Sequence, residues 1–352
     1  MKIIFLFLCK YLGLFFLSNF LLRKKILILC YHGFEIKNES QFRPQLFIKK
    51  ESFERRLKLL RNSSSVVISL DEAIRKLETD SLPNNSVVIT IDDGFYSVLK
   101  IAFPLLQQYD FPATLYQTTR DMQKEQPILH LLIAYMIETS TKNTIISRQY
   151  KWGSEEKIEL KHSQNKKDLI NSCLSFVEKL DSIKEVEQFC KELGDELGIN
   201  YENVRDSRLL TLLNESEVSE LASKGLDIQL HTHSHRFPQN DPEKASLEIK
   251  NNKNILKYLT DQPLKHFCYP SGEWSTLHWS ILNKEGIKSA TTCSPGLNDS
   301  KVSVLALNRF LDGENIANIV FEAELYRFNE FMRILRTKFN RVIFPHKIKI
   351  SM

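Results

Sequence analysis

The chain has no recognisable disulfide framework. Its six cysteines show neither a CxxC pair nor dense, regular spacing. Two of them lie in apolar runs, so we expect free, buried thiols, a state that fits a reducing compartment.

The chain also lacks a strong charge bias, internal repeats and low-complexity tracts. Its 48 basic and 43 acidic residues leave a formal net charge of +5, without an arginine-rich or basic–aromatic run. These absences argue against a nucleic-acid partner. Hydrophobic residues make up 42% of the 352 residues, which is enough for a large core. The length allows two domains, or one α/β barrel with insertions.

One long hydrophobic run is present over residues 3–22, and the sequence RKK follows at 23–25. Its length is about that of one membrane crossing. No small-x-small site follows, which argues against a cleaved signal peptide. We therefore expect residues 1–25 to be membrane-associated, with a helix packed on the protein or lying in the membrane interface as alternatives. The basic residues after the run favour the cytoplasmic side for the rest of the chain.

Basic residues gather again in the C-terminal segment, residues 323–352. The pattern is typical of a solvated helix face and is also compatible with contact to anionic lipid or an acidic glycan. The basic residues concerned are Arg327, Arg333, Arg336, Lys338, Arg341, Lys347 and Lys349.

Between these ends, short apolar runs alternate with helical patterns, as in β-α-β units. The alternation breaks at about 120–212, which is too long for a single crossover. We interpret this stretch as an inserted subdomain with a hairpin around 152–154, acting either as a solvated cover or as a lid that shapes the substrate site. Strands are expected over 25–31, 66–70, 86–91, 113–117, 226–230, 265–269, 289–292 and 306–310, and helices over 51–60, 69–77, 97–109, 168–180, 183–197, 215–224, 242–259 and 277–285.

Two short motifs follow predicted strands: TIDDG at 90–94 and HTHSH at 231–235. Strand ends are where parallel α/β barrels assemble active sites. Of two adjacent carboxylates, one can bind a metal while the other is directed at the reacting water. His231 and His235 are four apart, so on one helical turn they would face the same way and share a metal. A polar loop without a ligand is the alternative. The combination predicts a metal-assisted hydrolase.

These motifs resemble those of the polysaccharide deacetylases with a NodB-type domain, carbohydrate esterase family 4. Residues 90–94 match TFDDG, and His231, Thr232 and His235 match H-[ST]-x-x-H. CYPSG at 268–272 matches the third motif, RxPYG, only in part. It looks like the YPxG variant of exopolysaccharide and biofilm deacetylases, in which a Tyr-His pair such as 31–32 replaces the usual C-terminal histidine. The resemblance covers about 26–118 and 214–312, without a fourth motif.

The resemblance implies a distorted (β/α) barrel over 26–322, with the insertion at about 120–212. It also implies a divalent metal, zinc before cobalt, nickel or iron. The implied metal ligands are Asp93, His231 and His235; the implied catalytic groups are Asp92 as general base, His32 as general acid and the backbone N–H of Ser271 as an oxyanion donor.

Two positions depart from the family pattern or extend it. The third-motif arginine, which orients the base, is replaced by Cys268; Arg309, at the end of a predicted strand, is the candidate substitute and would pair with Asp92. A surface or structural arginine is the alternative. Trp274 and Tyr269 are the candidate substrate contacts, whereas Trp279 is expected in the core.

The resemblance therefore implies metal-dependent N-deacetylation of an N-acetylated polysaccharide or glycolipid, with release of acetate. Two alternatives remain open: a related amide hydrolase acting on a small non-sugar substrate, and a catalytically silent glycan-binding barrel.

Overall fold

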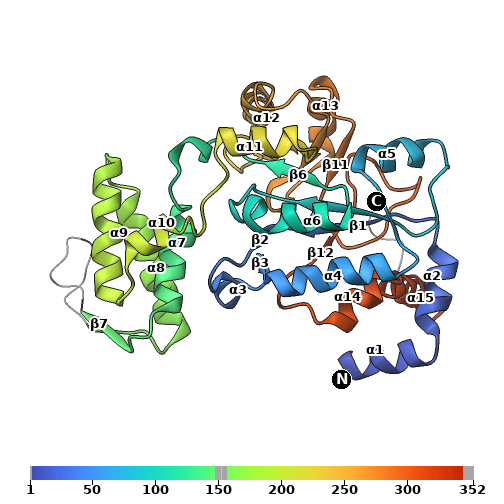
Figure 1. Cartoon of the computed structure of the whole chain (residues 1–352), viewed down its shortest axis with the longest axis horizontal. Coiled ribbons are helices and arrows are strands. Elements are labelled where there is room, and N and C mark those ends of the chain that lie inside the picture. Colours follow the sequence, from blue (N-terminus) through green and yellow to red (C-terminus); the bar gives the residue numbers. More distant parts are fainter. Residues whose placement is uncertain (1, 147–151, 153–156, 344–352) are drawn as a thin grey trace.

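A curled, parallel β-sheet forms the centre of the computed structural model, which describes residues 2–146, 152 and 157–343 (Figure 1). The strand order is β11-β10-β9-β6-β5-β1-β12, and β4 pairs with the start of β5. The strands are β1 (Leu27–Tyr31), β4 (Val66–Val67), β5 (Ser86–Ile91), β6 (Thr114–Gln117), β9 (Asp227–Leu230), β10 (His266–Cys268), β11 (Ser289–Thr291) and β12 (Phe310–Leu311).

The last strand closes the sheet. Thr291 of β11 forms a parallel bridge with Leu307, and β12 pairs with β1 through Leu29 and Phe310. Residues 307–311 therefore contact both edges of the sheet, and the sheet curls into the predicted distorted barrel. The strand expected over 306–310 is short because its pairing is divided between these two neighbours.

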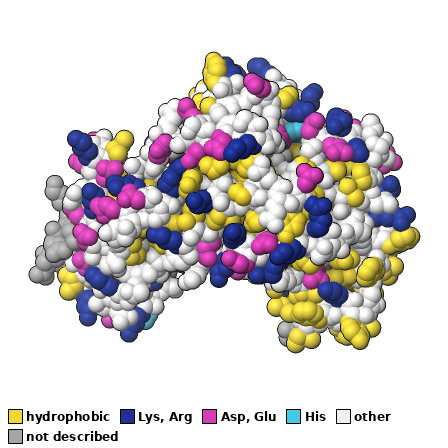
Figure 2. All heavy atoms as spheres, viewed as in Figure 1, with side chains coloured by type: hydrophobic (Ala, Val, Ile, Leu, Met, Phe, Trp, Pro, Cys, Tyr) yellow, Lys and Arg dark blue, Asp and Glu magenta, His cyan; other side chains and the backbone are white. Residues whose placement is uncertain are grey.

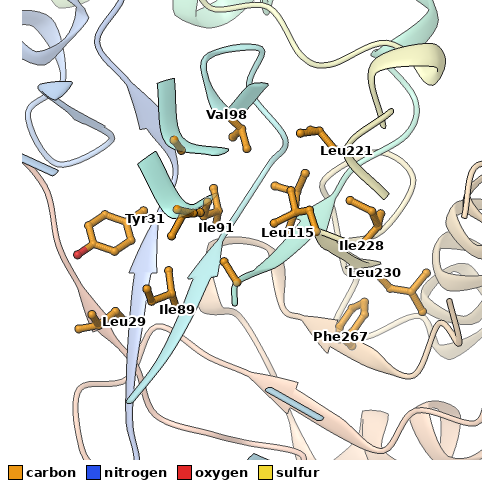
Figure 3. Close-up of a cluster of buried hydrophobic side chains, with 14 of the residues drawn as sticks. Leu29, Tyr31, Ile89, Ile91, Val98, Leu115, Leu221, Ile228, Leu230 and Phe267 are labelled. Carbon is orange, nitrogen blue, oxygen red and sulfur yellow. The ribbon is translucent and has the colours of Figure 1, made fainter. Parts of the chain in front are cut away.

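The two faces of the sheet are buried by alternating residues. Outward-facing side chains such as Leu29, Ile89 and Leu115 pack against the surrounding helices (Figure 3). Inward-facing Ile28 and Val88 pack with side chains of α5. The helices around the barrel are α4 (Lys50–Asn62), α5 (Leu70–Glu78), α6 (Phe103–Tyr109) with the preceding π-turn η1 (Val98–Ala102), α11 (Glu215–Ser223), α12 (Pro242–Leu256), α13 (Trp279–Lys284) and α14 (Asn318–Leu325).

The stretch between β6 and α11 builds a lobe of its own, which lies to the left of the barrel in Figure 1. Its helices enclose a separate hydrophobic cluster, to which Phe47 and Phe95 of the barrel side contribute. The expected hairpin is present as an antiparallel pair, although its turn lies mostly outside the described residues. The lobe contains α7 (Leu129–Thr139), β7 (Thr144–Ile146), β8 (Lys157–Glu159), α8 (Ser163–Val177), α9 (Ile183–Leu197) and α10 (Tyr201–Asp206).

Short elements complete the chain between β1 and α4 and around the third motif. The pair β2–β3 is parallel and lies directly after β1. These elements are β2 (Gly33–Phe34), α3 (Glu39–Phe42), β3 (Phe47–Ile48), and the 3-10 turns η2 (Met122–Lys124), η3 (Pro270–Gly272) and η4 (Thr276–His278).

The N-terminal hydrophobic run is not one helix. It forms α1 (Lys2–Tyr11) and α2 (Leu14–Leu22), separated by Gly13 with a φ of 75° and bent by 79°. No single helix in the described part of the chain is long and apolar enough to cross a bilayer, although this bent pair reaches the necessary length. Both helices pack on α14 and α15 (Phe328–Ile343). The side chains of Lys338 and Arg341, and all of Lys347 and Lys349, lie outside the described residues.

The cysteines are free thiols, as predicted. Five of the six are buried, and Cys293 is half-buried. Two of the buried thiols, Cys30 and Cys268, lie inside the barrel beside the first carboxylate of the 90–94 motif.

A buried histidine gives the fold a measurable pH dependence. Burial of His266 on β10 lowers its pKa to about 4, although Asp71 lies 3.7 Å from its Nε2. An unfolded histidine titrates near 6.5. Between about pH 6.5 and 4 the unfolded chain therefore binds a proton that the folded chain does not, and stability falls with falling pH by up to about 3 kcal/mol. We expect His266→Gln to remove this part of the slope in chemical unfolding measured from pH 7 to 4. The exposed His162→Gln is the control and should keep the wild-type slope.

Candidate active site

Three side chains from two strand ends meet at the mouth of the barrel. Oδ1 of Asp93 lies 3.2 Å from Nε2 of His231 and 3.2 Å from Nε2 of His235. Nδ1 of His231 contacts the carbonyl oxygen of Cys268 at 2.9 Å. Nδ1 donates in that contact, which fixes the orientation of the ring so that Nε2 faces the shared position. The predicted ligand set is therefore assembled in space.

The backbone at these residues is bent into unusual conformations. Asp93 has a φ of 70°, Thr232 of 62° and His235 of 57°, all in the left-handed region. The predicted helical turn over 231–235 is wrong: the segment is an irregular bend, and the two imidazoles converge because of these φ values. Gly94, with a φ of 88°, is required next to Asp93, because a Cβ there would lie 2.0 Å from the Gln117 side chain.

Helix α12 holds the histidine loop in place. The fully buried Asn252 accepts the backbone N–H of His231 at 2.9 Å and donates to the carbonyl oxygen of Gln117 at 3.0 Å. One turn earlier, Glu248 accepts both the N–H and the hydroxyl of Ser234 at 2.7 Å. Neither residue is identified by the sequence analysis, because a polar residue in an amphipathic helix carries no signal of a distant loop.

Asp92, the first aspartate of the 90–94 motif, binds an arginine and not the two histidines. Arg309 binds Asp92 through two hydrogen bonds of 2.7 Å, one from each terminal nitrogen, and both side chains are buried. The contact predicted between these residues is present. Nε of Arg309 donates to the carbonyl oxygen of Thr292 at 2.8 Å, which fixes the plane of the guanidinium.

The Arg309 guanidinium lies against Cys268, which stands where the family motif has an arginine. Its terminal nitrogen lies 3.2 Å from Sγ of Cys268, and that sulfur lies 3.3 Å from Oδ2 of Asp92. Burial raises the pKa of the Cys268 thiol well above its usual value, so the group stays neutral beside the ion pair. A small neutral side chain at 268 therefore gives room for an arginine that arrives from another strand.

The two aspartates are both held as anions, by different partners. Burial by itself would raise the pKa of Asp92, but the charge and hydrogen bonds of Arg309 outweigh burial and hold the pKa well below its ordinary range. For Asp93, hydrogen bonds from His231 and His235 likewise outweigh burial and lower the pKa. Burial would lower the pKa of His231, but Asp93 and Asp92 raise it above its ordinary value.

His32, at the end of β1, reaches the same site. Its Nε2 lies 3.8 Å from Oδ2 of Asp92, and its side chain is 17% exposed. This distance is longer than a hydrogen bond but keeps the two groups in direct electrostatic contact. The structure therefore places the candidate acid beside the candidate base; the catalytic role of His32 stays a prediction.

The residues predicted to contact the substrate differ in how much of each is exposed at the site. Ser271, with a φ of 56°, is exposed beside His235 in a hollow of about 620 Å³. The prediction that Tyr269 contacts the substrate is wrong. Its ring is fully buried, and its hydroxyl donates to the carbonyl oxygen of Leu305, so it presents no surface to a sugar. Trp274 is half-buried and stacks on Trp279 with an interplanar angle of 4°, which leaves only part of its ring for a ligand.

A larger cavity of about 930 Å³ runs from the candidate metal ligands into the inserted lobe. Asp93 and His235 line its near end, and Ile183, Val186 and Cys190 of α9 line its far end. His130, from the first turn of α7, also lines this cavity. Sequence reasoning missed His130 because α7 is buried on almost all sides and shows no amphipathic pattern.

The residues present fit a divalent metal. One carboxylate oxygen and two imidazole nitrogens lie within 4.8 Å of one another, and this donor set suits zinc and similar ions. The hydrogen bond from His231 to the backbone and the exposure of His235 leave one side of the triad accessible to a substrate.

Comparison with known proteins agrees with this geometry. Residues 196–290 match the family model described as polysaccharide deacetylase. This match includes both histidine ligands and the third motif. Residues 196–290 thus resemble part of a polysaccharide deacetylase domain. No match was found among curated proteins.

Solved structures show that the chain shares its fold with known deacetylases. The Streptococcus pyogenes deacetylase PplD has a TM-score of 0.55 at 19% identity, covering 83% of this chain and 94% of that one. IcaB from Ammonifex degensii has a TM-score of 0.52 at 14% identity, covering 86% and 95%. A polysaccharide deacetylase from Bacillus cereus has a TM-score of 0.52 at 16% identity, covering 86% and 69%. At these identities the likeness establishes the barrel fold.

The division of labour between the aspartates can be tested by metal analysis. We expect Asp93→Asn and His231→Ala to lose bound metal, because the first replaces the anionic ligand oxygen with a neutral amide oxygen and the second removes a ligand atom from the triad. Asp92→Asn should keep the metal and lose turnover, because Asp92 binds Arg309 instead. A metal-free Asp92→Asn together with a fully loaded Asp93→Asn would reverse the assignment.

The Arg309–Asp92 pair should control the acid limb of the pH profile. Without the guanidinium, burial raises the pKa of Asp92, so Arg309→Met should lose activity at a higher pH than the wild type while keeping its metal. Arg309→Lys, which restores the charge but not the two-point contact, should recover part of the acid-side activity.

The control for this experiment is Arg327→Met. Arg327 is also fully buried, but it binds Asn19 and the carbonyl oxygen of Leu325 away from the site. Its loss should lower stability and leave the pH profile unchanged. An unshifted acid limb in Arg309→Met would show that Arg309 does not keep the base ionised.

Proposed function

We propose that the protein is a metal-dependent N-deacetylase that removes acetyl groups from an N-acetylated glycan or glycolipid. The observation that carries this proposal is that the two adjacent aspartates have different partners. Asp93 joins two histidines in a three-atom ligand set, while Asp92 is buried against Arg309, whose positive charge favours the ionised carboxylate. A purely glycan-binding barrel has no need for a buried, ionised carboxylate next to a ligand triad.

The residues of the chain divide the reaction between them. A divalent metal at the triad supplies Lewis acidity toward the amide carbonyl and lowers the pKa of water. Asp92 accepts the proton of the attacking water, because Arg309 keeps the carboxylate ionised and fixes its direction. His32, beside Asp92, donates a proton to the departing amine nitrogen. The backbone N–H of Ser271 donates to the carbonyl oxygen as negative charge develops there.

The larger cavity supports a substrate with an apolar portion. On the α9 side the cavity is lined by the aliphatic Ile183 and Val186 together with the polar Asp181, Ser182 and Glu187. An acyl or isoprenoid chain can contact the aliphatic part of this wall, whereas sugar-binding surfaces rely on aromatic faces and hydrogen-bonding groups. Within the proposed function we therefore favour a glycolipid over a long polysaccharide. A small non-sugar amide would leave most of the 930 Å³ unfilled.

Acetate release with appearance of a free amine tests the proposal. The metal-loaded protein is given an N-acetylhexosamine oligomer, an N-acetylhexosamine carrying a long alkyl chain, and a simple acetamide, with Asp92→Asn as the inactive control. We expect turnover of the sugars only, with the lower KM for the alkyl glycoside. Val186→Asp should raise KM for the alkyl glycoside at least about tenfold with little change in kcat, because it places a charge in the apolar wall.

Each outcome of this experiment separates two interpretations. Equal KM values for both sugars would leave the deacetylase in place and remove the glycolipid preference. Turnover of the acetamide alone would favour the small-amide hydrolase. Metal binding without acetate release from any substrate would favour a silent binding barrel.

A further inference from the structure

The outer surface of the N-terminal helix pair is the largest concentration of exposed hydrophobic side chains in the described part of the chain. Figure 2 shows them gathered at the lower right, over α1 of Figure 1. We call this surface the hairpin face. Its eleven members make up more than half of the large hydrophobic side chains that the described residues expose: Ile3, Ile4, Phe5, Phe7, Leu8, Tyr11, Leu12, Phe16, Leu17, Phe20 and Leu21.

The inner surface of the same two helices is firmly attached to the body of the protein. Phe15 packs on Phe328 with ring centroids 4.9 Å apart, and the Ser18 hydroxyl donates to the carbonyl oxygen of Tyr326 at 2.9 Å. The side chain of Lys10 pairs with Glu322. Moving the pair into a straight transmembrane helix would break these contacts and expose the buried side of α14.

We infer that the hairpin face docks in the plane of a lipid bilayer, with α1 and α2 lying in the interface and the barrel outside it. Contiguous apolar patches of this kind mark interaction surfaces. The hairpin face offers almost no hydrogen-bonding group except the Tyr11 hydroxyl, so it suits hydrocarbon better than a specific protein partner. The helix pair is bent by 79°, and the fold itself holds it in that shape.

The charge around the hairpin face fits an anionic membrane. The first acidic residue of the chain is Glu35, whereas basic residues occur at both ends of the helix pair. Lys24 is exposed directly after α2, and Arg336 is exposed on α15, next to the exposed Met332 and Leu335. The basic C-terminal segment noted in the sequence thus begins beside the hairpin face, since α15 packs on α2. Cations beside an apolar surface bind anionic lipid headgroups.

Vesicle co-sedimentation of the purified full-length protein tests the docking independently of any catalytic activity. We expect the wild type to bind phosphatidylethanolamine–phosphatidylglycerol vesicles and to bind phosphatidylcholine vesicles more weakly. Each of the single variants Phe7→Glu, Phe16→Glu and Phe20→Glu should lower the affinity for the anionic vesicles about tenfold. The matched control is the triple variant Leu247→Glu, Tyr258→Glu and Leu277→Glu, which changes equally exposed apolar residues elsewhere. It should bind vesicles as the wild type does, and unchanged thermal unfolding shows that the variants are folded.

Fluorescence quenching distinguishes lying in the plane from crossing. Tryptophan placed at Phe7 or at Phe16 should be quenched by lipids brominated near the headgroup end of the chain, to a similar extent at both positions. Strong quenching of either position by lipids brominated at the chain terminus would indicate a crossing helix and overturn the inference. Unchanged vesicle binding in the hairpin variants would also overturn it, as would a dimer that dissociates in those variants without any vesicle binding in the wild type.

Discussion

The ionised state of Asp92 inside the barrel depends on one buried guanidinium, and much of the structure serves to bring that guanidinium into place. Removing one partner of a buried ion pair typically costs about 3 to 5 kcal/mol, yet an intact pair adds little net stability compared with a well-packed apolar core. The Arg309–Asp92 pair is therefore poorly explained as a means of stabilising the fold. It is well explained as a means of keeping a carboxylate charged, dry and fixed in direction next to a metal site.

Around this pair, the site separates into rigid and adaptable parts. The candidate metal ligands lie on strand ends and on a loop fixed by Asn252 and Glu248 of α12, so the barrel determines their geometry. The cavity beyond them is shared with the inserted lobe, which has a hydrophobic cluster of its own. Substrate selection can thus change by altering the lobe, while the chemistry stays with the barrel.

Local signals carried most of what could be predicted. The strand over Ser86–Ile91 was predictable to the residue because a β-branched run ends at two charges. Helix α9 was equally clear, because Ser182 caps its start and Gly198 ends it with a φ of 70°. Residue type and spacing indicated the two histidines of the candidate triad, and the family resemblance indicated Asp93. Long-range features could not be predicted: the left-handed bends at Thr232 and His235, the hydrogen bond from Asn252, and the burial of Tyr269 all depend on packing partners far away in the sequence.

The closing strand has a consequence for the order in which the molecule is completed. Arg309 follows Asp92 by 217 residues. During synthesis, Asp92 emerges from the ribosome long before the cation that neutralises it exists. A lone carboxylate resists transfer into an apolar interior in its charged form. The segment that joins the two edges of the sheet is also the one that carries Arg309, so the residues that complete the barrel and those that complete the ion pair are the same.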